Sequence, residues 1–365
     1  MNSNRLTERF FRYVKCASES RNEADFCKLL EDELIDLGLE VRRDHAGEQC
    51  GSNGWNIFAR LDGTGNPILF STHLDTVYPG NNIKPVLESG IIRSSSDTIL
   101  GADDKAGIAA VMEALECISE NGCAHRTVEV LFTLCEEIGM LGAKYADYKN
   151  IQSREAIVLD SDNLGEIINR NPANVVLHFI IDGKSAHAGL APQEGIHALK
   201  AAAQAVAAIP VGYVDDISAM NISNFISEGK TNVVADKAAF DMEIRSFDEE
   251  RLQQHIKSSE NAVRLACKSF GANYEMSMER HSDVIHIPEK SPLITDVIIA
   301  YQSLGVKYNI TRSFGGCDAT YLFAHGIDVL NIGIGMQAVH SSNEHISVND
   351  LKITSELVYA IIINS

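Results

Sequence analysis

Acidic residues and histidines stand at the ends of several apolar segments of the chain. His73 and Asp75 end PILFSTHLD (67–75), and in an extended strand side chains two residues apart point to the same face. One of the two could bind a metal ion while the other orients it through a hydrogen bond. By itself this pair is a weak motif, because an ordinary hydrogen-bonded surface pair has the same spacing.

Two adjacent pairs of carboxylates are more distinctive. Asp103 and Asp104 precede a predicted helix. Either residue could cap that helix, but together they repel each other unless a cation or the helix N-terminus offsets their charge. Glu136 and Glu137 end the predicted strand TVEVLFTLCEE, where one glutamate could bind a metal ion while its neighbour holds a water molecule.

The last candidates follow two further apolar segments. Asp160 ends EAIVLD (155–160), and His340 follows the strand-like LNIGI (330–334). In an open α/β sheet the strand ends at one edge line the binding crevice, so these separate residues are expected to converge. Two histidines with several carboxylates suit zinc, cobalt or manganese, whereas calcium rarely binds imidazole.

Alternating strands and helices predict an α/β fold that would position these residues. Apolar periodicity predicts helices at 5–16, 22–38 and 104–120 and strands at 56–61, 67–75, 127–137 and 155–160. From Asn174 the order becomes strand, helix, strand, helix, strand, which predicts a small inserted α/β domain with its own sheet. We therefore expect a discontinuous first domain, residues 1–172 and 286–365, and an insertion, residues 173–285.

Composition and charge limit the class of protein. With 365 residues, 45% of them apolar and 22% charged, the chain is expected to be a soluble folded protein of about two domains. Its net charge of -19 would repel nucleic acid and anionic membranes. Eight cysteines without a CxxC pair, and an N-terminus without an apolar core, predict free thiols in a cytoplasmic protein.

Five motifs stand in the order found in a known superfamily. STHLDTV, GADDKAG, CEEIGMLGA, LDSD and HSSNEHI resemble the dinuclear zinc hydrolases that include peptidase T, aminoacylase, carboxypeptidase G and acetylornithine deacetylase. GADDKAGIAA and LDSD are most similar to the peptidase T branch. The segment DGKSAHAGLAPQEGIHAL resembles the dimerisation-domain motif. The resemblance implies a mixed-sheet catalytic domain, with an inserted ferredoxin-like lid through which the chain forms a homodimer.

The resemblance also implies a metal centre with two divalent ions, zinc first and cobalt or manganese as alternatives. Asp103 would bridge the two ions. His73 and Asp160 would complete one site, and Glu137 and His340 the other.

Further roles are implied around this centre. Glu136 would be the general base that takes a proton from a metal-bridging water, so that hydroxide attacks the amide, and later protonates the leaving amine. Asp75 would orient His73, and the peptide bond between Asp103 and Asp104 would be cis.

Three residues of the insertion would contact the substrate. His187, in SAHAG, would stabilise charge on the carbonyl oxygen from the partner subunit. Asn232 and Arg245, on the predicted strand TNVVADKAAFDMEIRSFD, would hold a substrate carboxylate. The loop FGGCDATYL also resembles a family loop near the site, without an assigned role.

These features favour a peptidase. Asp rather than Glu at position 160 is typical of the aminopeptidase members, so a di- or tripeptide aminopeptidase is expected. An N-acyl amino acid deacylase or a carboxypeptidase of the same superfamily is the alternative. A non-catalytic, metal-stabilised binding protein is a remote alternative, since such a protein would not need Glu136 beside the ligand Glu137.

Overall fold

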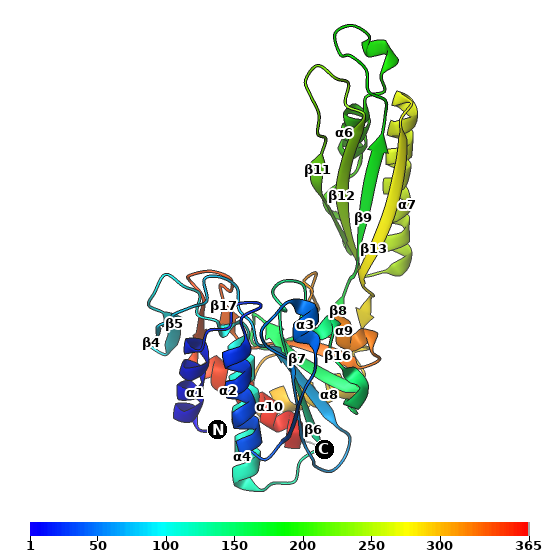
Figure 1. The fold of residues 1–365 in the computed structure, drawn as a ribbon. Coiled ribbons are helices and arrows are strands. Elements are labelled where there is room, and N and C mark those ends of the chain that lie inside the picture. The colour runs from blue at the N-terminus through cyan, green and yellow to red at the C-terminus, as the bar shows by residue number, and fades with distance from the viewer. Residues whose placement is uncertain (364–365) are drawn as a thin grey trace. The chain divides into compact units, whose positions relative to one another are not determined.

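The chain divides into two compact units in the computed structural model, which describes residues 1–363 (Figure 1). Unit 1 consists of residues 1–169 together with the described residues from Ile287 onward, and unit 2 is Arg170–His286. The boundaries predicted from the sequence, 172/173 and 285/286, differ from these by three residues and by one residue. Among the described residues, no helix is long and apolar enough to cross a membrane.

The larger sheet is mixed, as predicted. Its strands follow the order β1-β2-β6-β3-β7-β16-β8-β14, and β15 also pairs with β8. β3 lies parallel to β6 and β7, and β16 lies parallel to β7, whereas β1, β2 and β8 pair antiparallel with their neighbours. The strands are β1 Glu40–Arg43, β2 Ile57–Leu61, β3 Ile68–His73, β6 Val128–Thr133, β7 Glu155–Ser161, β8 Glu166–Asn171, β14 Ile285–His286, β15 Asn309–Arg312 and β16 Asp328–Gly333.

Helices surround this sheet and make its centre apolar. Every residue of β3 and β6 is buried, as expected for parallel strands covered on both faces. The long helix α4 packs on β3 and β7 and also against α1 and α10 (Figure 1). The helices are α1 Ser3–Lys15, α2 Ala24–Asp36, α3 Ala46–Cys50, α4 Ala102–Asn121, α5 Leu141–Lys144, α8 Pro292–Ser303, α9 Ala319–Ala324 and α10 Val348–Ile363.

A second, small sheet holds the segment that carries His340. Its order is β17-β18-β5-β4, and β18 pairs antiparallel with β5, so the C-terminal strands join a hairpin from the first third of the chain. The sequence did not predict this sheet. Its strands are β4 Pro85–Glu88, β5 Ile91–Ser94, β17 Met336–Gln337 and β18 His345–Ser347.

Unit 2 is a five-stranded antiparallel sheet with two helices. Its order is β10-β11-β12-β9-β13. Alternate residues of β9 and β12 are buried, and α6 and α7 pack on these strands. Without β10 the chain order is β-α-β-β-α-β, the ferredoxin-like arrangement. Its elements are β9 Ala173–Asp182, α6 Ala198–Ala208, β10 Gly212–Asp215, β11 Ser218–Ile226, β12 Lys237–Ser246, α7 Glu249–Phe270 and β13 Asn273–Ser282.

Two predictions for unit 2 were wrong in detail. The predicted order of strand, helix, strand, helix, strand lacked β10 and β11, because these strands carry many exposed residues and no clear apolar alternation. The predicted strand from Thr231 begins only at Lys237, since residues 231–232 form a turn.

Candidate metal centre

The carboxylate of Asp103 lies between two imidazoles. Its Oδ1 is 2.9 Å from His73 Nε2, and its Oδ2 is 3.1 Å from His340 Nε2. His340 Nε2 is also 3.0 Å from the Glu137 carboxylate. Asp160 Oδ1 is 4.0 Å from His73 Nε2. The structure therefore brings all five predicted ligands together, with His73 and Asp160 on one side of Asp103 and His340 and Glu137 on the other.

This donor set fits two metal ions. Two ligands at about 2.0–2.1 Å from a tetrahedral ion lie roughly 3.3 Å apart, which is close to the nitrogen-to-oxygen separations at Asp103. One ligand atom from each of His73, Asp103 and Glu137 lies within 4.8 Å of the others. A carboxylate with one imidazole at each oxygen is suited to bridge two cations.

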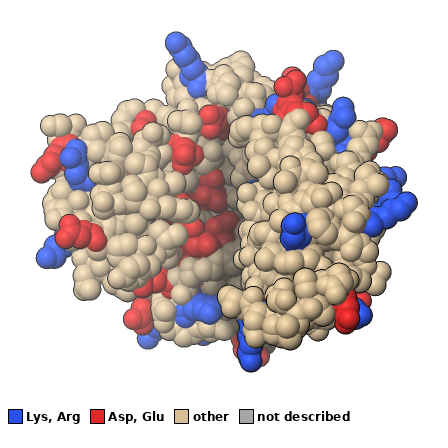
Figure 2. Space-filling view, turned by 90° about the horizontal axis from the view of Figure 1, so that it is seen from above, with Lys and Arg blue, Asp and Glu red and all other residues tan. Residues whose placement is uncertain are grey.

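Charge repulsion in the centre also favours cations. Burial raises the pKa of Asp160 well above its usual range, and the nearby Asp103 carboxylate adds to the rise. The hydrogen bond to Asp103, and to a lesser extent the one to Glu137, raises the pKa of His340 to about 10. On the face shown in Figure 2, acidic side chains gather together. Positive ions would relieve the repulsion between these buried carboxylates.

Asp75 holds both His73 and the glutamate pair. The backbone oxygen of Asp75 lies 2.9 Å from His73 Nδ1, closer than the Asp75 carboxylate at 3.5 Å. The carboxylate instead accepts the N–H groups of Glu136 and Glu137, at 2.8 and 3.3 Å, and the hydroxyl of Ser20 at 2.6 Å. The backbone oxygen of Asp75, rather than its carboxylate, would therefore orient His73. The carboxylate of Asp75 fixes the loop that carries Glu136 and Glu137.

The glutamates lie in a turn rather than in a strand. β6 ends at Thr133 and not at Glu137 as predicted, because Cys135 has a φ of +50° and leaves the extended conformation. The N–H of Gly139 donates to the backbone oxygen of Glu136 at 2.9 Å and closes the turn. Apolar composition alone could not show this end, since Leu134 and Cys135 are both fully buried.

The start of α4 is irregular at the acidic pair. Asp103 and Asp104 have non-helical dihedral angles, and the peptide bond between them is cis, as the resemblance implied. Gly107 is required next to this irregular start, since a Cβ there would lie 2.4 Å from Asp104 Oδ1.

A pocket of about 310 Å³ lies at the centre. It is lined by the ligands Asp103, Glu137, Asp160 and His340, by Glu136, and by other residues that include Ser313, Gly315 and Gly316. The larger cavity of about 450 Å³ beside β1, β2 and β6 contains none of the predicted site residues, so its size carries no functional meaning here.

Glu344 is a positioning residue that the sequence did not reveal. Its side chain is buried, and its Oε2 accepts the N–H groups of Leu100 at 2.7 Å and Gly101 at 2.8 Å. Its Oε1 accepts the N–H of Asp103 at 3.1 Å. Because Glu344 follows His340 by four residues, one carboxylate joins the loops that carry two of the ligands.

Replacing Glu344 with alanine is expected to lower the free energy of unfolding by about 2–4 kcal/mol, because three buried N–H groups would lose their acceptor. Thermal or denaturant unfolding of the metal-free protein measures this loss. The matched control is Glu356→Ala, which removes a partly exposed ion pair with Lys352 and should cost about 0.5 kcal/mol or less. Equal stabilities of the two variants would contradict the role of Glu344.

In unit 2, His187 and Asn232 lie in neighbouring loops. The exposed His187 accepts the N–H groups of Gly189 and Leu190 at Nδ1, both at 3.1 Å. The ring proton of the neutral imidazole must therefore be on Nε2, which makes this atom a donor. Asn232 lies in the turn before β12, and its backbone oxygen accepts the N–H of Ala188 at 2.9 Å.

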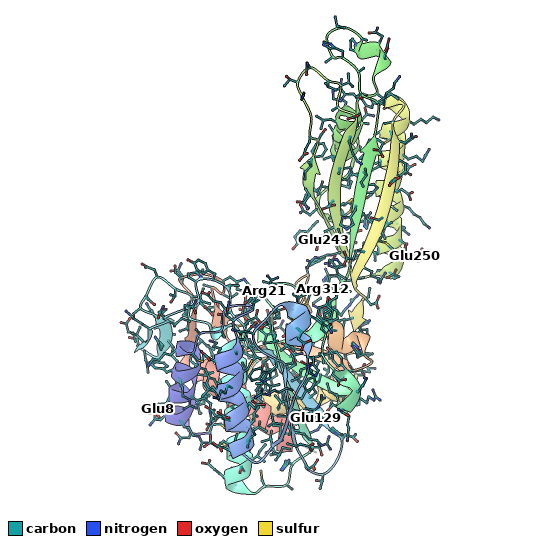
Figure 3. The ribbon with its side chains drawn as sticks, in the orientation of Figure 1. Glu8, Arg21, Glu129, Glu243, Glu250 and Arg312 are labelled. Atoms are coloured by element: carbon teal, nitrogen blue, oxygen red, sulfur yellow. The ribbon has the colours of Figure 1, made fainter. Side chains whose placement is uncertain are left out.

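Arg245 lies at the other end of β12 from Asn232. It is eight residues beyond Lys237, the first residue of the strand, which corresponds to roughly 27 Å. Arg245 Nη2 is 2.8 Å from Glu243 Oε1, and Glu243 is labelled near one end of the strands of unit 2 in Figure 3. Asn232 and Arg245 of the same chain are therefore not brought together.

Comparison with known proteins agrees with this geometry. Residues 69–364 match the Peptidase family M20/M25/M40. The Bacillus subtilis protein YqjE is 34% identical over 99% of this chain and 98% of its own, and a Bacillus cereus peptidase T is 27% identical over 98% and 97%.

Two solved structures are similar over the whole chain. The Bacillus cereus aminopeptidase PepT has a TM-score of 0.93 and 35% identity, covering 100% of this chain and 98% of that one. A Staphylococcus aureus tripeptidase has a TM-score of 0.93 and 30% identity, with the same coverage. These matches confirm the resemblance stated from the five motifs. The chain therefore belongs to the peptidase family M20/M25/M40, near its peptidase T branch, and is a hydrolase that acts on peptide bonds.

Proposed function

We propose that this protein is a metal-dependent aminopeptidase that hydrolyses di- and tripeptides. The observation that carries the proposal is the position of Asp103 between His73 and His340, with Glu136 in the same pocket. The names of the two similar structures, an aminopeptidase and a tripeptidase, support this substrate class.

Two divalent ions are the proposed cofactors, zinc first and cobalt or manganese next. His73 and Asp160 would hold one ion, Glu137 and His340 the other, and Asp103 would lie between them. Bound there, the ions would supply Lewis-acid chemistry and lower the pKa of a water molecule.

Glu136 is the proposed general base. Its side chain lines the pocket beside Asp103, Glu137 and Asp160. Burial raises the pKa of Glu136 well above its usual range, and the nearby carboxylates of Asp318 and Glu137 add to the rise. Glu136 can therefore hold a proton taken from the attacking water and release it to the leaving amine.

Unit 2 is the proposed dimerisation domain, and its substrate contacts would come from two subunits. His187 and Asn232 lie near one end of β12 and Arg245 near the other. This separation supports a homodimer in which His187 donates to the carbonyl oxygen in the partner's site. Arg245 and Asn232 would hold the substrate carboxylate. The eight free cysteines favour the cytoplasm.

His187→Ala is expected to lower kcat by about 10²–10³-fold without changing metal content, because a donor to the developing oxyanion is lost. Steady-state kinetics and metal analysis measure the two effects. His281→Ala, which removes an exposed imidazole near Glu279, is the control and should retain full activity.

Mixing subunits tests whether His187 acts across the dimer. If His187→Ala and Glu136→Ala chains are combined, a mixed dimer contains one intact site only when His187 serves the partner. Random mixing should then restore roughly a quarter of the wild-type activity. No recovery in a dimer shown to exchange subunits would contradict the assignment.

A substrate panel tests the function itself. Dipeptides and tripeptides with free or acetylated N-termini, free or amidated C-termini, and N-acetyl amino acids would be assayed with added zinc, cobalt or manganese. Cleavage that requires a free N-terminus supports an aminopeptidase. Preference for N-acetyl amino acids would make the protein a deacylase, and a requirement for a free C-terminus alone would make it a carboxypeptidase. No turnover of any amide with two bound ions would favour the binding protein.

A further inference from the structure

We propose that Asn331 is a positioning residue for the metal ligand Asp160. Its side-chain carboxamide forms the hydrogen bonds that a neighbouring strand would otherwise form, and so fixes the end of β7. The inference rests on the proposed role of Asp160 as a ligand but not on the identity of the substrate.

The carboxamide of Asn331 pairs with both backbone groups of Asp160. The N–H of Asp160 donates to Asn331 Oδ1 at 3.1 Å, and Asn331 Nδ2 donates to the backbone oxygen of Asp160 at 2.7 Å. The Asn331 residue is only 6% exposed, and both hydrogen bonds are partly buried. In a regular sheet, the neighbouring strand provides the same two groups as this carboxamide. It offers an acceptor for the residue's N–H and a donor for its backbone oxygen.

The pairing is needed because the strands lose register at this point. Along β7 and β16, Asn331 is opposite Val158, and Gly333 is opposite Ser161. Two steps on β16 therefore face three on β7, which is the count of a bulge. A bulge leaves backbone groups without their regular partners, and at Asp160 the side chain of Asn331 supplies them. The bulge can thus direct the carboxylate of Asp160 towards His73 without leaving its backbone unpaired.

The second hydrogen of Asn331 Nδ2 connects the pair of Asn331 and Asp160 to the wall of the pocket. Asn331 Nδ2 lies 3.4 Å from Cys317 Sγ, within the range of a weak hydrogen bond to sulfur. Cys317 is buried and directly follows Gly315 and Gly316, which line the pocket. One carboxamide therefore joins β7, β16 and the glycine loop.

Only a carboxamide of this length matches the site. An aspartate at position 331 would have the same shape, but it would present a second acceptor to the backbone oxygen of Asp160 and add a negative charge. An alanine would leave both backbone groups of Asp160 without a partner. Asn331→Asp is thus a test of hydrogen-bond polarity at constant volume, and Asn331→Ala is a test of the bonds themselves.

The experiment measures metal binding in the absence of substrate. Titration of the metal-free full-length protein with Co²⁺ gives affinity and stoichiometry, and the visible spectrum of the cobalt form reports ligand geometry. For Asn331→Asp and Asn331→Ala, we expect one of the two ions to bind about 10–100-fold more weakly, as for other residues that orient a ligand. The cobalt spectrum should also change, while circular dichroism shows the native fold.

Asn163→Asp is the matched control. It makes the same chemical change three residues beyond Asp160, at an exposed side chain whose Nδ2 donates to Glu166 at 3.1 Å. This variant should retain both affinities and the spectrum. If it weakened cobalt binding as much as Asn331→Asp does, the weakening would not depend on the contact with Asp160, and the positioning role would be wrong.

A second variant keeps the test decisive if the Asn331 variants do not fold. Cys317→Ala removes only the third contact of the carboxamide, and we expect a smaller weakening of the same ion. Wild-type affinity and spectrum in the folded Asn331 variants, or in Cys317→Ala if it alone folds, would overturn the inference. A wild-type protein that binds two ions but cleaves no peptide would refute the proposed function and leave the role of Asn331 standing. Failure of the wild-type protein to bind metal would overturn both.

Discussion

Glu136→Gln is expected to reduce peptide hydrolysis by about 10²–10⁴-fold while the protein still binds two metal ions, since general-base catalysis typically contributes that factor. Glutamine keeps the volume of the side chain but cannot accept the proton of the attacking water. Glu136 is not one of the five predicted ligands, which are Asp103 and the four residues grouped around it, so metal content should be unchanged. Steady-state kinetics and metal analysis of the same preparation measure both quantities.

Glu88→Gln is the control for this variant, because Glu88 is exposed at the end of β4. It should have wild-type kcat and KM. An active Glu136→Gln enzyme would contradict the general-base assignment. A Glu136→Gln protein without metal would instead make Glu136 a ligand.

Asp103→Asn is expected to abolish tight binding of both ions and to leave below about one thousandth of the wild-type rate, because metal ions commonly supply several kcal/mol of transition-state stabilisation. Both oxygens of the Asp103 carboxylate face an imidazole, so the loss of its charge affects both halves of the centre. Cobalt titration measures the affinities, and peptide hydrolysis at saturating metal measures the rate.

Asp97→Asn, at an exposed position six residues earlier, should behave as wild type. Binding of one ion with wild-type affinity by Asp103→Asn would show that Asp103 is not shared between the two sites. Binding of both ions would contradict its role as a ligand.

The strands and the long helix near the centre could be predicted from the sequence because their signals are local. β3, β6 and β7 are short, continuous apolar runs, and α4 begins after a glycine with two aspartates in its first turn. The candidate ligands lie at or near the ends of such elements, so the positions of the strand ends sufficed to predict that they converge. The superfamily motifs then supplied the individual roles.

The small sheet and the two positioning residues could not be predicted in this way. β17 and β18 have two and three residues, too few for a periodic pattern. Glu344 and Asn331 act through backbone groups of Asp103 and Asp160 that are distant in sequence. Hydrogen bonds of this kind depend on a bulge and on a loop conformation. Neither produces a recognisable pattern of residue types or spacings in the sequence.

The distance between the two ends of β12 has a practical consequence for the assay. If His187 serves the neighbouring subunit, a dissociated monomer lacks one of its own catalytic groups. Specific activity would then fall on dilution, with a midpoint at the dimer dissociation constant. Rates measured only in very dilute solution would underestimate the specific activity of the dimer.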